Sequence, residues 1–297
     1  MTFFSEDISR IAIGTAQYGM NYGIANKTGK ISDLEMNRIL NKAKDNNILT
    51  IDTAKSYGDC EQKLGKQVVD EFKVITKVSN LTQPRNNTND FVLEELKDSL
   101  GKLNLNNLDT LLLHRSKDLL DYKKNEIYES LILCKEAGLI NKIGISADNV
   151  SDVESIINIF DIDVVQFPLN IFNRELIESG LLKVLKNKGI EVHARSIFLQ
   201  GLLLMEKKEL NPYFNNWSSL FEDWEKWNEK NHLTKLEACL KYVVMFKEID
   251  KYIVGIDSLQ HLQEIIKILN SKNFKKVPIA LSSKEQALIN PSKWKLN

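Results

Sequence analysis

The stretch ILTIDTAKSYG, residues 48–58, decides the fold. Its first five residues form a short, mostly apolar run that ends in a carboxylate, Asp52, and a polar loop follows to Tyr57 and Gly58. Such a run is typical of a strand that is buried on both faces of a parallel sheet. Seven further runs have the same character, and we predict strands at residues 11–14, 74–77, 110–114, 142–146, 164–167, 191–194 and 252–255.

Helix signals fill the segments between these runs. Ser32 and Glu35 have the spacing of a capping box, and Ser151 and Glu154 repeat it. Leucines at steps of three and four predict one buried stripe over residues 91–103. Helices over 126–137 and 176–188 are each followed by a glycine, at 138 and 189, and Ser258 can cap a last helix.

Eight strand signals with seven clear helices between or after them predict a (β/α)₈ TIM barrel. No linker, low-complexity tract or repeat interrupts the chain, so residues 1–297 are expected to form a single domain. The region with the weakest signal for a strand or helix is 211–230, where Trp217, Trp224 and Trp227 lie within a polar stretch. We expect an insertion over the barrel mouth there, followed by a helix from about residue 236 to 246.

The overall charge narrows the classes of partner. The chain carries 40 basic and 40 acidic side chains, and a net charge of zero argues against nucleic-acid and membrane partners. Three scattered cysteines are too few for a disulfide framework and favour a reducing compartment. The first ten residues lack the apolar core of a secretory signal, and no apolar run could span a bilayer. We therefore expect a cytoplasmic protein.

Four polar side chains lie at or just after the ends of neighbouring strands. Asp52, Lys77 and His114 end the second, third and fourth runs, and Tyr57 follows Asp52 in the loop. Catalytic residues of a TIM barrel lie at the carboxyl ends of its strands, so these four are expected to converge. A lysine beside a phenol lowers its pKa, a carboxylate orients the lysine, and an imidazole can polarise a carbonyl oxygen. This set could protonate a carbonyl group while a cofactor delivers hydride.

The residues resemble the aldo-keto reductase family. The similarity lies in residues 51–58 with Glu61 and residues 64–65, then 76–77 and 109–115, and it continues through 142–146, Gln166, 201–203 and 253–255. It covers nearly the whole chain, in order. The resemblance implies a small carbonyl or alcohol substrate, with Tyr57 as the general acid, Lys77 as its pKa modulator, Asp52 as the lysine's partner and His114 polarising the carbonyl.

The resemblance also implies a cofactor site. Ser146 and Gln166 match positions that bind the nicotinamide carboxamide, and the segment from Gly255 to His261 matches the adenosine-phosphate side. The family often has a stacking tyrosine after the seventh strand, where Arg195 and Ser196 stand here, and it commonly has Ser-Asn where this chain has Ser146 and Ala147. A guanidinium can also stack on a flat ring, although it brings charge.

The sequence carries opposing signals for the choice of cofactor. The family usually prefers NADPH, which we take as the default for this chain, with NADH possible. The segment after the eighth strand has no Lys or Arg before Lys267. Ser258 could offer its hydroxyl and the first helix amides to a phosphate, whereas Asp257 suits a ribose 2′-hydroxyl. We predict weaker discrimination against NADH than is usual in the family.

Two other functions fit parts of the pattern. The chain could be a cofactor-binding regulatory or scaffolding subunit on the same barrel, or a metal-dependent hydrolase using Asp52, His114 and His193. Four histidines in the whole chain, without metal-ligand spacing, argue against the metal site, so no metal is expected. The sequence leaves open which carbonyl compound is the substrate and how many copies assemble. Candidate pocket walls are Tyr18, Tyr22, Phe198 and Trp217.

Overall fold

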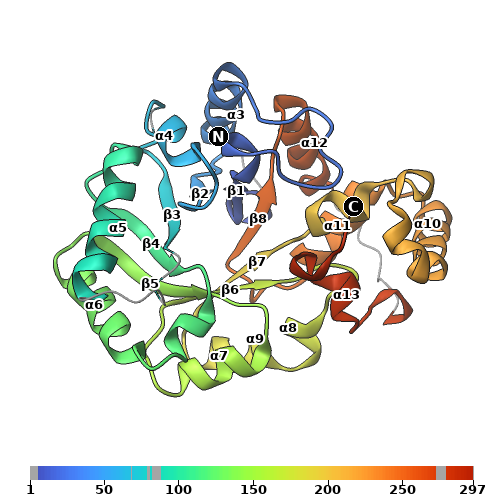
Figure 1. Ribbon diagram of the computed structural model, residues 1–297. Coiled ribbons are helices and arrows are strands. Elements are labelled where there is room, and N and C mark those ends of the chain that lie inside the picture. The colour runs from blue at the N-terminus through green and yellow to red at the C-terminus, as the bar shows by residue number, and fades with distance from the viewer. Residues whose placement is uncertain (1–5, 68, 79–80, 82–87, 272–278, 297) are drawn as a thin grey trace.

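Eight parallel strands form a closed barrel in which each strand pairs with the next and the last pairs with the first (Figure 1). The computed structural model describes residues 6–67, 69–78, 81, 88–271 and 279–296. The strands are β1 (Ile11–Gly14), β2 (Thr50–Asp52), β3 (Lys73–Val78), β4 (Leu108–Leu113), β5 (Ile140–Ser146), β6 (Val164–Pro168), β7 (Glu191–Arg195) and β8 (Lys251–Gly255). All eight predicted strands are confirmed, with ends that shift by one or two residues.

Helices surround the barrel and pack their apolar faces on it (Figure 1). In chain order they are α3 (Asp33–Asp45), α4 (Cys60–Leu64), α5 (Thr88–Leu103), α6 (Lys124–Glu136), α7 (Val150–Ile157), α8 (Glu175–Glu178), α9 (Leu181–Asn187), α11 (Lys235–Val244) and α12 (Leu259–Leu269). Shorter or additional helices are α1 (Glu6–Ser9), α2 (Ala16–Gly19), α10 (Ser218–Asn231) and α13 (Gln286–Ile289). The predicted (β/α)₈ TIM barrel is confirmed. Among the described residues, no helix has the length and apolar character to cross a membrane.

The helix caps show where local signals held and where they failed. Ser32 accepts a hydrogen bond from the Glu35 amide as predicted, but the Glu35 carboxylate accepts the Leu259 amide instead of turning back. The second capping box is wrong. Helix α7 begins at Val150, so Ser151 lies inside its first turn, and the preceding Asn149 bonds the Asp152 carboxylate.

The helix predicted over 176–188 is wrong as one element, because it is two helices. Gly180 takes a left-handed conformation, with φ of 82°, and separates α8 from α9. The predicted glycine ends are confirmed, because Gly138 and Gly189 follow α6 and α9 in the left-handed conformation, with φ of 71° and 73°. A glycine signal was therefore present at 180 too, but the apolar period continued across it.

The inside of the barrel is positioned by the two-residue period of its strands. Ile75, Leu112 and Val164 form a small buried cluster apart from the large core between strands and helices. Lys77 and Gln166 lie two residues further along β3 and β6, and His114 directly follows the end of β4. All three therefore face the same interior nearer the carboxyl ends of the strands. The two-residue period of the strands thus places polar side chains at the carboxyl-end side of this apolar cluster.

The tryptophan-rich insertion differs from its predicted place. It folds as a 3₁₀ helix (Pro212–Trp217) followed by α10, and Figure 1 shows α10 at the outer edge of the molecule, on the far side of α11 from the barrel centre. Its anchor is Trp224, which is buried and donates to the Leu203 carbonyl oxygen. Phe214 and Phe221 are buried together with Trp224, and none of the three lines the cavity at the barrel mouth.

Candidate active site

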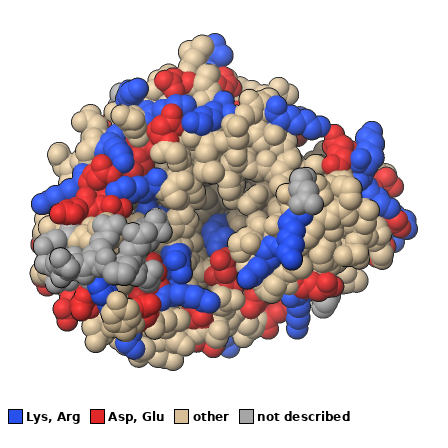
Figure 2. All heavy atoms as spheres, in the orientation of Figure 1, with Lys and Arg blue, Asp and Glu red and all other residues tan. Residues whose placement is uncertain are grey.

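A cavity of about 400 Å³ lies at the carboxyl ends of the strands. The molecule is hollowed at its centre in Figure 2, and a Lys or Arg side chain is visible inside the hollow. Eleven of the twelve predicted site residues line the cavity, namely Asp52, Tyr57, Lys77, His114, Ser146, Gln166, Arg195, Ser196, Gly255, Asp257 and His261. The exception is Ser258, which caps α12 by accepting the His261 amide.

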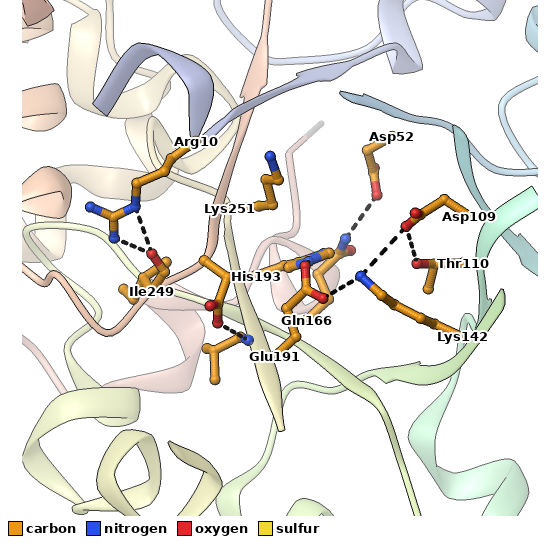
Figure 3. A network of polar contacts seen from close by, with 12 residues as sticks. Arg10, Asp52, Asp109, Thr110, Lys142, Gln166, Glu191, His193, Ile249 and Lys251 are labelled. Carbon is orange, nitrogen blue, oxygen red and sulfur yellow. Dashed lines mark hydrogen bonds and ion pairs between the residues drawn. The ribbon is translucent and has the colours of Figure 1, made fainter. Parts of the chain in front are cut away.

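The floor of the cavity holds a buried ion pair. Lys77 Nζ lies 2.7 Å from Asp52 Oδ1 and donates a second hydrogen bond of 2.9 Å to the Thr53 carbonyl oxygen. Gln166 Nε2 donates to the other oxygen, Asp52 Oδ2, at 2.8 Å (Figure 3). Only 1% of the lysine side chain and 3% of the aspartate side chain are exposed. Removing one partner would leave the other charge buried and uncompensated.

Two glycines fix the loop that carries Tyr57. A side chain on Gly19 would collide with the Tyr57 carbonyl oxygen, and Gly58, at φ of 62°, packs directly against Gly19. The other side of the loop is held by Lys55, which forms 2.8 Å ion pairs with Glu95 and Asp98 on α5. The sequence motif therefore sets the position of the tyrosine through its neighbours.

Tyr57, Lys77 and His114 meet over this floor. Lys77 Nζ lies 5.3 Å from the Tyr57 ring centroid, and the His114 ring meets the tyrosine edge-on with centroids 6.1 Å apart. His114 Nδ1 is 3.3 Å from Ser56 Oγ, which leaves Nε2 for another partner. A phenol, an ammonium and an imidazole around one cavity can move a proton to a small oxygen-containing molecule.

Burial dominates the electrostatics of the three groups. It raises the pKa of Tyr57 well above 10, and Asp52 raises it further while Arg195 opposes it. It lowers the pKa of Lys77, which the Asp52 ion pair counteracts. Burial, with help from Lys77 and Arg195, lowers the pKa of His114 to about 4. Arg195 is therefore a cation that opposes the effect of burial on the Tyr57 pKa.

Arg195 is held across the cavity by the end of β5. Its Nη2 donates to the Ala147 carbonyl oxygen at 3.1 Å and to Asp148 Oδ1 at 2.5 Å, and its Nη1 reaches Ser196 Oγ at 3.2 Å. Its buried Nε has no partner among the described residues. The two departures noted after the fifth and seventh strands are therefore in contact with each other. The sequence analysis missed Asp148, although this residue directly follows Ser146 and Ala147.

The opposite end of the cavity lies at the start of α12. Asp257 and His261 line it, with His261 Nδ1 3.2 Å from Asp257 Oδ1. The hydrogen bond from His261 lowers the pKa of Asp257. Glu35 accepts the Leu259 amide at 2.6 Å, so two of the helix-start amides expected to meet a phosphate already bond to Glu35 and Ser258.

The remaining wall includes residues that the sequence did not single out. Tyr22 and Phe198 line the cavity as predicted, whereas Tyr18 is fully buried and Trp217 is not in the lining. In their place, a segment near the end of the chain contributes Gln286 and residues 289–292. No local pattern marks these residues, since only the tertiary fold brings them to the mouth.

The insertion holds this last segment in place. Tyr213 Oη donates to the Ala287 carbonyl oxygen at 2.9 Å, and Trp217 Nε1 donates to Glu285 Oε2 at 3.0 Å. Phe214 meets Trp294 edge-on, with ring centroids 5.2 Å apart. The aromatic residues therefore act on the cavity through the tail that they anchor.

A second polar layer lies inside the barrel near His193 (Figure 3). His193 Nε2 is 3.0 Å from Glu191 Oε1, and Lys142 Nζ is 2.5 Å from the other oxygen of that carboxylate. Asp52 is already bonded to Lys77 and Gln166. Within the described residues there is no group of three or more His, Cys, Asp or Glu side chains placed to hold a metal ion. Asp52, His114 and His193, all of which the structure describes, do not form such a group.

A closed parallel barrel with these groups at its carboxyl end places the protein in the class of (β/α)₈ barrel enzymes. The sequence model of the Aldo/keto reductase family matches residues 10–281. The chain therefore belongs to the aldo/keto reductase family, whose members are oxidoreductases that generally use NAD(P)H on small carbonyl compounds.

Curated relatives are distant. The chain is 26% identical to the aldo-keto reductase YhdN of Bacillus subtilis over 210 residues, a match that spans 66% of this chain and 60% of that relative. It is 22% identical to the L-glyceraldehyde 3-phosphate reductase of Escherichia coli O157:H7, over 86% of this chain and 85% of that protein.

Among solved structures, the holo form of aldo-keto reductase AKR11C1 from Bacillus halodurans has a TM-score of 0.72 at 19% identity, covering 90% of this chain and 88% of that one. The thermostable aldo-keto reductase Tm1743 has a TM-score of 0.67 at 22% identity, covering 90% and 91%. These similarities extend over nearly the whole chain, and at such low sequence identities they show that the fold is shared.

Proposed function

We propose that the protein is an NAD(P)H-dependent reductase of small aldehydes or ketones in which Tyr57 is the general acid. The observation that carries this proposal is the buried ion pair between Lys77 and Asp52 beside the Tyr57 ring, at the floor of the cavity. A buried charge pair is expensive to form and is rarely needed for stability. Its place next to a phenol and an imidazole gives it a catalytic use.

The cavity has groups that fit a nicotinamide. Gln166 Nε2 is committed to Asp52, while Gln166 Oε1 receives a long contact of 3.5 Å from Ser146 Oγ. That oxygen and the Ser146 hydroxyl would hold the carboxamide, and Arg195 would lie against the ring with its unpartnered Nε. Ser196, Gly255, Asp257 and His261 would hold the adenosine side. When bound, the cofactor supplies hydride for the carbonyl carbon.

The protein's own groups would then manage the proton. Burial keeps the Tyr57 phenol protonated, so its Oη can give a proton to the alkoxide oxygen as negative charge develops there. The Lys77 ammonium stabilises the phenolate that remains, and Asp52 keeps that ammonium charged and oriented. A neutral His114 donates a hydrogen bond to the same substrate oxygen, because its pKa of about 4 keeps it uncharged near neutrality.

The wall composition favours a polar substrate. Amide side chains line much of the cavity, at Gln17, Asn26, Asn173, Gln200, Gln286 and Asn290. Amides bond hydroxyl groups as both donors and acceptors, and Arg195 adds a positive charge. Hydroxylated aldehydes and ketones, including phosphorylated ones such as the substrate for which the E. coli relative is named, are therefore the compounds to test first.

The test is a substrate screen that follows the absorbance of the reduced cofactor. Sugar aldehydes, ketoses and glyceraldehyde 3-phosphate are offered with NADH and with NADPH in parallel. We expect turnover with at least one hydroxylated carbonyl compound, and its loss in Tyr57→Phe. Tight cofactor binding without turnover on any compound would favour the regulatory or scaffolding subunit instead.

A further inference from the structure

The end of the cavity near α12 has the opposite charge from its floor. Asp257 lies at the boundary of the main cavity and a second hollow of about 290 Å³, and it lines both. Its carboxylate is held by His261 Nδ1 at 3.2 Å and by Ser258 Oγ at 3.4 Å. A fixed, charged carboxylate therefore faces whatever part of a dinucleotide reaches this end.

A second carboxylate occupies the start of the helix. Glu35, from α3, accepts the amide of Leu259, the first residue of α12, at 2.6 Å. Helix amides at an N-terminus are the groups that attract phosphate, because they carry free donors and the positive end of the dipole. Here an internal carboxylate takes the place of an external anion, and Ser258 Oγ takes the His261 amide as well.

The cations recorded around this end already have anionic partners. Lys27 lines the second hollow, but its Nζ lies 2.7 Å from Glu209 Oε1 and its side chain is 75% exposed. Arg38, one turn along α3, lies 3.5 Å from Glu35. The lysine and arginine of the main cavity lining, Lys77 and Arg195, belong to the catalytic end. Glu209 and Glu35 thus have basic partners, whereas the ion-pair partner of Asp257 among the described residues is His261.

We propose that this end of the cavity selects a dinucleotide whose adenosine ribose has a free 2′-hydroxyl, because Asp257 and Glu35 set two carboxylates at the start of α12. The protein is accordingly an NADH-preferring member of its family. This inference rests on the proposed function, and it replaces the NADPH default expected from the sequence.

The selection follows from elementary electrostatics. A ribose hydroxyl can donate a hydrogen bond to the Asp257 carboxylate, whereas a phosphate has only acceptor oxygens and carries about −1.5 to −2 charges at neutral pH. Like charges a few ångströms apart at a protein surface repel each other. The neighbouring amides bonded to Glu35 and Ser258 cannot offset this repulsion without breaking those bonds.

Direct binding is the first measurement. NADH and NADPH are titrated into the full-length protein without any carbonyl compound, with tryptophan fluorescence and calorimetry as readouts. We expect NADH to bind at least about tenfold more tightly. The fragments ADP and 2′,5′-ADP should show the same order in competition, which isolates the effect at the adenosine end. Equal or tighter binding of the 2′-phosphorylated ligand in either pair would overturn the inference.

Two near-isosteric variants locate the cause. Glu35→Gln keeps an oxygen that can accept the Leu259 amide, and Asp257→Asn keeps an acceptor beside His261, so each removes charge with little change of shape. Each should raise the affinity for NADPH relative to NADH by about threefold to tenfold, and the double variant by more. Asp223→Asn, an exposed carboxylate on α10, is the matched control and should leave the ratio unchanged.

The outcomes separate this inference from the proposed function. If neither dinucleotide binds the wild-type protein, the proposed function itself fails. If both bind and NADPH binds equally well or better, the reductase proposal stands while the selection proposal falls. If NADH is preferred but neither charge-removing variant alters the ratio, the carboxylates are not the cause and the structural argument is wrong.

Discussion

The two ends of the cavity handle charge in different ways. At the floor, the opposite charges of Lys77 and Asp52 are buried together and shielded from water. At the α12 end, the Asp257 and Glu35 carboxylates lie near the surface, with 42% of the Asp257 side chain exposed. Charge held in a dry site is fixed at high cost, which suits chemistry, whereas charge at a wet rim is cheap and suits selection among ligands. The size of a substitution's effect should follow this difference.

The largest effect is expected at Tyr57. Tyr57→Phe keeps the ring that packs beside Lys77 and His114 but removes the proton donor, so the rate of reduction should fall by about 10² or more. Cofactor affinity should survive, because the loss is specific to the transition state. Single-turnover absorbance measurements with saturating cofactor report the rate.

Tyr22→Phe is the comparison that makes the test specific. Tyr22 also lines the cavity, and burial also raises the pKa of its phenol. We expect a loss smaller than about tenfold there. Near wild-type turnover in Tyr57→Phe, or an equal loss in both variants, would contradict the assignment of the acid.

Lys77→Met should have the next largest effect. It removes the ammonium beside Tyr57 and leaves the Asp52 carboxylate buried without its ion-pair partner, so turnover should fall by about 10² and the folded state should lose stability. The pH profile of turnover should also change shape, because the phenolate loses the positive charge beside its ring. Lys77→Met combined with Asp52→Asn should recover stability without recovering turnover. Recovery of both would show that the pair is merely structural.

Arg195 lies between the two ends, and its removal should cost less. Arg195→Ala deletes the positive charge that opposes burial at Tyr57, and it releases Asp148. We expect affinity for cofactor, for anionic substrates or for both to weaken about tenfold. Arg195→Lys tests whether charge alone is enough, since lysine cannot bond Ala147, Asp148 and Ser196 with one planar group. Unchanged constants for every ligand would leave Arg195 with a structural role only.

The smallest effect concerns His114 and pH. Its pKa of about 4 in the folded protein lies below the ordinary value near 6.5, because of burial and the charges of Lys77 and Arg195. Between these pH values the unfolded chain binds more protons, so the contribution is complete above about pH 6.5 and stability falls as the pH drops toward 4. His114→Gln should reduce that decline by about 1 kcal/mol between pH 6 and 5. Urea unfolding of both proteins at the two pH values measures it, and parallel declines would contradict the pKa assignment.

The barrel and its floor were predictable because their signals are local. A buried strand shows as an apolar run, and its last residue identifies a side chain at the carboxyl end, which gave Asp52, Lys77 and His114 their places. Gln166 was expected to bind the nicotinamide carboxamide, but its hydrogen bond to Asp52 was not expected. Strand order supplies position, while the choice of partner depends on side-chain rotamers.

The rest of the site depends on contacts between distant segments. Glu35 had the spacing of a capping residue, yet it accepts an amide 224 positions away at α12. Two helices that pack together decide that contact, and neither helix alone encodes it. The last segment reached the cavity for the same reason, since aromatic residues of the insertion determine where it lies. Patterns within one element cannot report such pairings.

The anchoring of the last segment by Tyr213, Phe214 and Trp217 has an evolutionary consequence. One part of the mouth is built from a segment that is fastened from outside the ring of helices, so mutations there need not disturb the strands or the buried ion pair. The range of accepted substrates can drift through residues 286–292 while the proton-handling apparatus is inherited unchanged. Related proteins can therefore come to differ in the substrates they accept before they differ in the reaction they catalyse.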